Sequence, residues 1–130
     1  MTLLLIEDDD IEILKLKRCI AKLGQHHAID EAHNGEEALA LLEGKSLPDL
    51  LLLDLNMPKM NGLEFLKRLR EIDRLKCLPT VILTTSVNKT DLKAAYALGV
   101  AGYIVKPLRY EDYVLKIEVL LNYWKHNELV

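Results

Sequence analysis

Short apolar runs alternate along the chain with longer segments in which apolar residues recur at helical spacing. Five runs are predicted to be strands, and they cover residues 2–7, 27–32, 49–54, 80–85 and 102–106. Five amphipathic segments are predicted to be helices, and they cover residues 10–23, 35–43, 62–74, 88–98 and 110–125. Asparagine or glycine stands at several of the joins, as at Asn34-Gly35, Gly44 and Gly99. The pattern therefore predicts a strand followed by a helix, five times over.

The first, third and fourth runs are apolar on consecutive residues, which is typical of strands that are covered on both faces. This predicts an α/β fold, a doubly wound parallel sheet of five strands with helices on both faces. The 130 residues contain no linker, repeat or low-complexity tract. We therefore expect one domain over residues 1–130, with no second, output domain.

Composition excludes several classes of function. The 17 basic and 20 acidic residues give a net charge of −3, which offers no basic surface for nucleic acid or an anionic membrane. The N-terminal apolar run is too short for a signal peptide, and no stretch is long enough to span a bilayer. Cys19 and Cys77 fit no metal or redox spacing and are expected to be reduced and to fill the core. These features favour a cytoplasmic location.

Polar residues stand where the predicted strands end. Parallel α/β sheets bind ligands outside the carboxyl ends of their strands, so these residues are the candidates for chemistry. They are Glu7 and Asp8, Asp54, the run Thr84-Thr85-Ser86, and Lys106-Pro107. Three carboxylates, hydroxyl groups and an ammonium group are thus predicted to meet at one edge of the sheet.

The charges of this set indicate its chemistry. Three crowded carboxylates repel one another unless a cation joins them, and oxygen ligands without His or Cys select a hard ion such as Mg²⁺. With that charge screened, Asp54 could attack phosphorus and form an aspartyl-phosphate. Lys106 and Thr84 would then supply a positive charge and a hydroxyl group to the added oxygens.

These motifs match a known family. The segments "IEDD", "LLLLDLNMPKMNG", "VILTTS" and "GYIVKPL" resemble, in order and at the right spacing, the receiver domain of two-component response regulators. The segment that begins "LTTSVNKTDL" and the "YW" near the C-terminus further resemble the stand-alone receivers associated with bacterial phytochromes. The resemblance covers nearly the whole chain, and it implies a flavodoxin-like sheet with strand order 2-1-3-4-5.

The same resemblance assigns roles to the site residues. It implies that Asp54 is the phosphoacceptor, and that Asp8, Asp54 and the backbone carbonyl of Asn56 bind Mg²⁺, with Glu7 acting through water. Lys106 would contact the phosphoryl group, and the Lys106–Pro107 bond is expected to be cis. Thr84 and Tyr103 would form a switch pair that responds to phosphorylation.

Other interpretations of these residues are weaker. Glu7, Asp8 and Asp10 could instead cap the helix that follows them. A phosphatase of the haloacid-dehalogenase type would carry an acid two residues after its nucleophile, where this chain has Asn56. A flavodoxin-like cofactor binder needs a Gly-rich and hydroxyl-rich loop after the first strand, and "EDDDIEIL" would repel a phosphate.

Partners follow from the resemblance and from the last helix. The implied partner is a sensor histidine kinase, phytochrome-like or otherwise, or a histidine phosphotransfer protein. The stripe Tyr113, Ile117, Leu120 and Trp124 is predicted to face the core. Apolar residues also fall on the opposite side of this helix and on the helix before it, and we expect them to form a homodimer interface: Tyr96, Leu115, Val119 and Tyr123.

Overall fold

A computed structural model describes residues 1–44 and 46–129 of the chain. Five parallel strands form one sheet in the order β2-β1-β3-β4-β5. They are β1 (Thr2–Ile6), β2 (Ala28–Ala32), β3 (Leu50–Leu53), β4 (Thr80–Thr84) and β5 (Gly102–Val105). This is the predicted strand order. Every described pair of neighbouring strands is parallel, as was also predicted.

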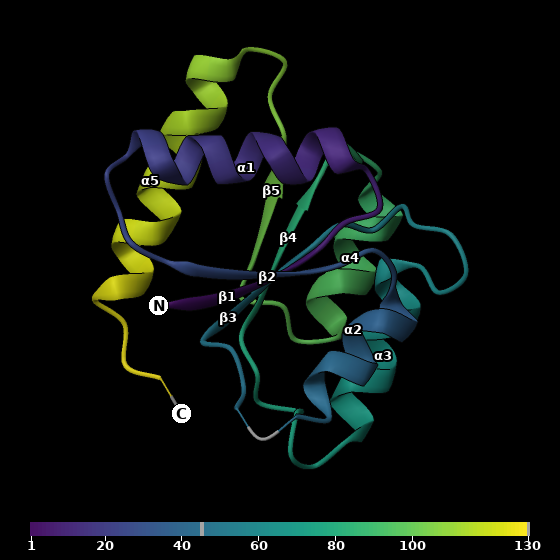
Figure 1. The fold of residues 1–130 in the computed structure, drawn as a ribbon. Coiled ribbons are helices and arrows are strands. Elements are labelled where there is room, and N and C mark those ends of the chain that lie inside the picture. The colour runs from purple at the N-terminus through teal and green to yellow at the C-terminus, as the bar shows by residue number, and fades with distance from the viewer. Residues whose placement is uncertain (45, 130) are drawn as a thin grey trace.

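A helix follows each strand, as the alternating pattern predicted. The helices are α1 (Asp10–Lys22), α2 (Gly35–Leu42), α3 (Gly62–Glu71), α4 (Lys89–Ala97) and α5 (Tyr110–Lys125). Helix α3 ends three residues earlier than predicted, because the backbone at its C-cap, Ile72, is extended. In Figure 1, α1 and α5 lie on one side of the sheet, and α2, α3 and α4 lie on the other.

The consecutive leucines of the central strands alternate between the two faces of the sheet. Leu51 and Leu53 of β3 join the core under α2, α3 and α4. Leu50 and Leu52 join the core under α1 and α5. Every residue of β3 and β4 is buried. In β2, at an edge of the sheet, exposed and half-buried positions alternate up to the last residue, Ala32, which is buried. The continuous apolar runs therefore marked the strands that have a helical layer on each side.

Two predictions about single residues have different outcomes. The stripe Tyr113, Ile117, Leu120 and Trp124 is buried, as expected from its helical spacing. Cys19 is buried, but Cys77 is exposed, so the prediction of a core role for Cys77 was wrong. Cys77 lies in the loop between α3 and β4 and not on a helix or strand that faces the core.

No helix in the described part of the chain is long and apolar enough to cross a membrane.

Candidate functional site

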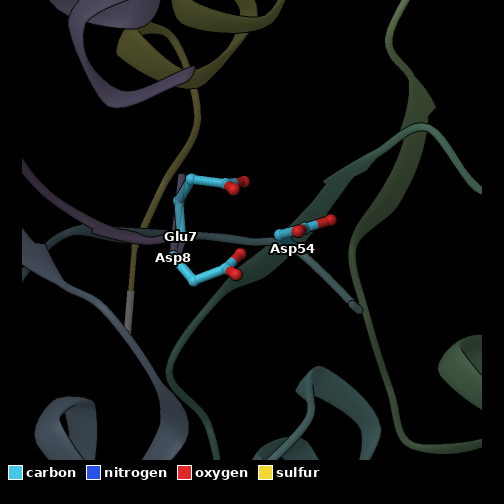
Figure 2. Close-up of side chains that lie close together, drawn as sticks. All are labelled: Glu7, Asp8 and Asp54. Atoms are coloured by element: carbon cyan, nitrogen blue, oxygen red, sulfur yellow. The ribbon is translucent and has the colours of Figure 1, made fainter. Parts of the chain in front are cut away.

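Two neighbouring strands bring three carboxylates together. Ile6 of β1 pairs with Leu53 of β3, so Glu7 and Asp54 leave the sheet at the same level. The amide nitrogen of Asp54 donates to the carbonyl oxygen of Ile6 at 3.0 Å. Oxygen atoms of Glu7, Asp8 and Asp54 all lie within 4.8 Å of one another, and Figure 2 shows the carboxylates of Glu7 and Asp8 turned toward the side on which Asp54 lies. The structure therefore assembles the predicted acidic cluster.

The cluster is largely removed from solvent, which makes its negative charge costly. Glu7 is 3% exposed and Asp54 is 7% exposed, whereas Asp8 is exposed. Burial raises the pKa of Glu7 to about 7; the charge of Asp54 adds to this rise, and Lys106 opposes it. An all-oxygen donor set of this charge fits a hard divalent cation such as Mg²⁺, with Asp8 facing the solvent from which an ion would arrive.

Lys106 supplies a positive charge to the cluster. Its backbone nitrogen donates to the carbonyl oxygen of Thr84 at 2.7 Å, which fixes the residue just after β5. Its side chain is only 7% exposed, and its ammonium group lies 3.2 Å from Glu7 Oε2 and 3.3 Å from Glu12 Oε2. Burial lowers the pKa of Lys106, but the charges of Glu7, Glu12 and Asp54 outweigh it and raise this pKa overall. The lysine is therefore held in its charged form.

The sequence reasoning missed Glu12, and a signal for it was available. Asp9 is the N-cap of α1, since its side chain accepts from the amide nitrogen of Ile11 at 2.9 Å. Glu12 stands four and seven residues before Leu16 and Cys19, which are both buried. That spacing places Glu12 on the inner face of α1, one turn from the carboxyl ends of the strands. An acid on an otherwise apolar face was the signal.

The loop after Asp54 is shaped by its backbone. Asp54 Oδ1 accepts from the amide nitrogen of Leu55 at 2.9 Å. Lys59 has a positive φ of 65°, and Asn61 caps α3 in a reciprocal capping box with Glu64. Asn56 is exposed and lines an open cleft of about 420 Å³ with Asp8 and Asp91, among others. The cleft gives a molecule from solvent a way to the acidic cluster.

Thr84 and Tyr103 are linked through Ser86. Thr84 is fully buried, and its hydroxyl oxygen accepts from the amide nitrogen of Ser86 at 3.3 Å. The hydroxyl group of Tyr103 donates to the carbonyl oxygen of Ser86 at 3.1 Å. Ser86 Oγ in turn donates to Asp91 Oδ2 of α4 at 2.8 Å. The loop after β4 therefore connects the predicted switch residues to α4.

The predicted cis bond between Lys106 and Pro107 is wrong. The described part of the chain contains no cis peptide bond. Proline makes the cis form accessible, but the trans form is still favoured by about 0.5 to 1 kcal/mol. A proline after Lys106 is therefore compatible with either geometry.

The four residues predicted to form an interface are all exposed. Tyr96, Leu115, Val119 and Tyr123 are 51%, 57%, 60% and 62% exposed. The three on α5 line a shallow, mostly apolar groove of about 680 Å³, whose floor includes Tyr103, Ile104 and Val105 of β5. Tyr96 of α4 is not part of its lining. The groove thus connects the outer face of α5 to the strand that carries Tyr103.

Known proteins share this fold and sequence. Residues 3–118 match the model of the response regulator receiver domain. A probable methanogenesis regulatory protein, FilR2, of Methanothrix harundinacea is 37% identical over 127 residues, which are 94% of this chain and 82% of that protein. The phosphorylated cyanobacterial phytochrome response regulator RcpA superposes with a TM-score of 0.90 at 31% identity, over 98% of this chain and 96% of that one.

The Mn²⁺-bound response regulator Rcp1 superposes with a TM-score of 0.89 at 30% identity, over 99% of this chain and 98% of that one. The family match spans most of the chain, and both solved response regulators superpose on nearly its whole length. The chain therefore belongs to the response regulator receiver family.

Proposed function

We propose that this protein is a stand-alone, cytoplasmic response regulator that accepts a phosphoryl group on Asp54. The donor would be the phosphohistidine of a sensor histidine kinase, phytochrome-like in view of the similarity to RcpA, or of a histidine phosphotransfer protein. The observation that carries the proposal is the buried Asp54 carboxylate within 4.8 Å of two other acids, with the Lys106 ammonium group bound beside them. This set has a nucleophile and the charges that phosphoryl transfer needs.

The proposed reaction begins at Asp54. A carboxylate oxygen of Asp54 attacks phosphorus, the bond between phosphorus and the histidine nitrogen breaks, and its electron pair returns to the imidazole. Asp8, Asp54 and the backbone carbonyl of Asn56 would hold Mg²⁺, with Glu7 reaching it through water. The ion, when bound, offsets the negative charge of the acids and of the phosphoryl oxygens. Rcp1, which is similar in fold and sequence, is a Mn²⁺-bound protein.

The remaining residues respond to the new charge. Lys106 would leave its carboxylate partners to bind the phosphoryl group. Thr84 would turn its hydroxyl toward the same group and give up the bond from the Ser86 amide nitrogen. Because Tyr103 also hydrogen-bonds to Ser86, a shift of this loop would change the position of the tyrosine ring.

We expect Thr84→Ala to accept phosphate normally and to lose the amide shifts that beryllofluoride causes in α4 and α5.

The changed surface would carry the signal. We propose that the protein forms a two-fold symmetric homodimer through Tyr96, Leu115, Val119 and Tyr123, tightened by phosphorylation.

The rival function, an aspartyl-nucleophile phosphatase, lacks support at one position. Its general acid would stand two residues after Asp54, where Asn56 carries an amide, which is too weak an acid to protonate a leaving group.

Acetyl phosphate with Mg²⁺ tests the proposed reaction, because this small donor needs only the nucleophile, the cation and Lys106. Intact-mass spectrometry should show one added phosphoryl group on the wild type and none on Asp54→Asn. Asp30→Asn, which removes an exposed acid on β2, is the matched control and should be labelled like the wild type. Full labelling of Asp54→Asn would refute the assignment.

The metal assignment has its own test. Asp8→Ala should weaken Mg²⁺ binding in calorimetric titration more than Glu7→Ala, because a direct ligand contributes more than one that acts through water. An equal loss in the two variants, or a larger loss in Glu7→Ala, would count against the assignment.

A further inference from the structure

Lys106 is held by two acids that belong to different parts of the chain. Glu7 follows β1, and Glu12 lies in the first turn of α1. Their Oε2 atoms lie 3.2 Å and 3.3 Å from the same ammonium group. Within the described part of the chain, no oxygen of Asp54 lies within 4.0 Å of this group. The ammonium group is therefore bound away from the residue that would carry the phosphoryl group.

The two contacts differ in kind. Lys106 Nζ donates a hydrogen bond to Glu7 Oε2. Glu12 Oε2 is buried and has no hydrogen-bond partner among the described residues, although Lys106 Nζ lies 3.3 Å away. The contact of Glu12 with Lys106 is therefore an ion pair without the geometry of a directed bond. Such a contact attracts the lysine and leaves its hydrogen-bond donors free to reorient.

We infer that Glu12 is a positioning residue that retains Lys106 in the unphosphorylated protein and competes with the phosphoryl group for it. The inference rests on the proposed function, in which Lys106 binds the phosphoryl group on Asp54. Glu12 is not one of the three clustered acids, and its ion pair is with Lys106, so it acts on the cluster through Lys106. Glu12 therefore limits how strongly the Lys106 ammonium group can bind the phosphoryl group on Asp54.

The direction of the effect follows from the charges. Phosphorylation adds negative charge beside Asp54 and draws Lys106 toward it. Glu12 opposes this step, because its carboxylate attracts the same ammonium group. Replacing Glu12 by glutamine removes the negative charge and keeps the size of the side chain. The variant should therefore bind a phosphoryl group more tightly than the wild type, whereas simple damage to the site would weaken binding.

Beryllofluoride, which mimics the phosphoryl group, tests the inference at a Mg²⁺ concentration that saturates each variant. Titration followed by amide chemical shifts gives the affinity, and we expect Glu12→Gln to bind about threefold to tenfold more tightly. The phosphoryl group taken from acetyl phosphate should also last longer on this variant. Asp10→Asn is the matched control, since it removes one charge from the same turn of α1 at a residue that does not contact Lys106.

A double variant tests whether Glu12 acts through Lys106. In the background of Lys106→Ala, Glu12→Gln should change beryllofluoride affinity no more than Asp10→Asn does. An unchanged or weaker affinity of the single variant, an equal gain in Asp10→Asn, or a full gain without Lys106 would each overturn the inference. If Glu12→Gln does not fold, Glu12→Asp replaces it, because a shorter side chain withdraws the carboxylate and should give a smaller gain. Failure of the wild type to be labelled on Asp54 would instead refute the proposed function.

Discussion

Gly62 occupies a position that a larger residue could fill only by moving the backbone that carries Asp54. A Cβ atom there would lie 2.3 Å from the carbonyl oxygen of Asp54 and 2.8 Å from the Cα atom of Leu55. We expect Gly62→Ala to lower the free energy of unfolding by about 1 to 3 kcal/mol and to slow labelling by acetyl phosphate. Urea unfolding and intact-mass kinetics would measure the two effects.

Gly102→Ala is the control for Gly62→Ala. Its Cβ atom would meet Val81 at 3.7 Å, which is an ordinary van der Waals distance. This variant should therefore keep the stability and the labelling rate of the wild type within a small margin. Equal losses in both alanine variants would mean that the close approach of Gly62 to Asp54 is not the cause.

Glu7 makes the stability of the metal-free protein depend on pH. Because burial raises its pKa from 4.5 to about 7 on folding, the folded state favours the protonated acid. The contribution of Glu7 to the stability of the folded state is present in full below the pKa of Glu7 in the unfolded chain. It is lost as the pH rises through about 7, the pKa of Glu7 in the folded chain. The loss between these limits is on the order of 3 kcal/mol. Glu7 therefore weakens the fold at neutral pH and above when no cation is bound.

We expect Glu7→Gln to remove this dependence, because an amide cannot ionise and still offers an oxygen to Lys106. Urea unfolding in a chelator, from about pH 5 to about pH 8, should show the variant gaining stability relative to the wild type as the pH rises. Glu36→Gln, an exposed acid on α2, should follow the wild type. Parallel curves for Glu7→Gln and the wild type would contradict the assigned role of burial.

Single residues at the site were predictable to different degrees. Asp54 and Glu7 could be found because each directly follows an apolar run, and parallel strands end at one edge. Glu12 could not be assigned a partner from its spacing alone, since Lys106 lies 94 positions away in the chain. The ion pair between them depends on how α1 packs over the end of β5, and this is a property of the folded chain.

At the scale of elements, strands were easier to delimit than the ends of helices. The runs of β1, β3 and β4 are bounded by polar residues on each side, so their limits agree with the structure to within about one residue. Helix α3 was overextended because Ile72 and Leu75 continue its apolar spacing. The structure instead uses Leu75 in the core after the helix has ended. Local periodicity does not distinguish these two ways of burying a side chain.

Arg70 of α3 hydrogen-bonds to two loops that precede β4 and β5, at the end of the sheet opposite the acidic cluster. Its role was not recognised in the sequence. Its guanidinium group donates to the carbonyl oxygens of Leu98 and Gly99, between α4 and β5, at 2.8 Å and 3.1 Å. It also donates to those of Lys76 and Leu78, before β4, at 3.1 Å and 3.0 Å. One side chain of α3 thus satisfies four backbone acceptors in two loops.

We expect Arg70→Met to lower the free energy of unfolding by about 2 to 3 kcal/mol, because these carbonyl groups lose their donors while the apolar part of the side chain remains. Arg68→Met changes an exposed arginine of the same helix and should have little effect. Urea unfolding of both variants measures the difference. Equal stabilities would show that water replaces the arginine at no cost.

At the scale of the whole molecule, the groove beside α5 joins the site to the proposed dimer interface. The hydroxyl group of Tyr103 bonds to Ser86 in the loop after β4, and its ring lines the groove with Leu115, Val119 and Tyr123. Any movement of this loop that displaces Tyr103 would therefore change the shape of the apolar groove. In a two-fold dimer this surface meets a copy of itself, so one change would act twice.

This arrangement predicts that phosphorylation strengthens self-association. Sedimentation velocity should show a larger dimer fraction in beryllofluoride and Mg²⁺ than in Mg²⁺ alone, because the ligand favours the state with the altered groove. Val119→Asp should abolish the dimer in both conditions, since each copy would bring a charge into the apolar contact. Leu41→Asp places the same charge on α2, in the opposite helical layer, and should leave association unchanged. A wild type that stays monomeric at high micromolar concentration in both conditions, or a dimer that tolerates Val119→Asp, would assign the groove to a different partner.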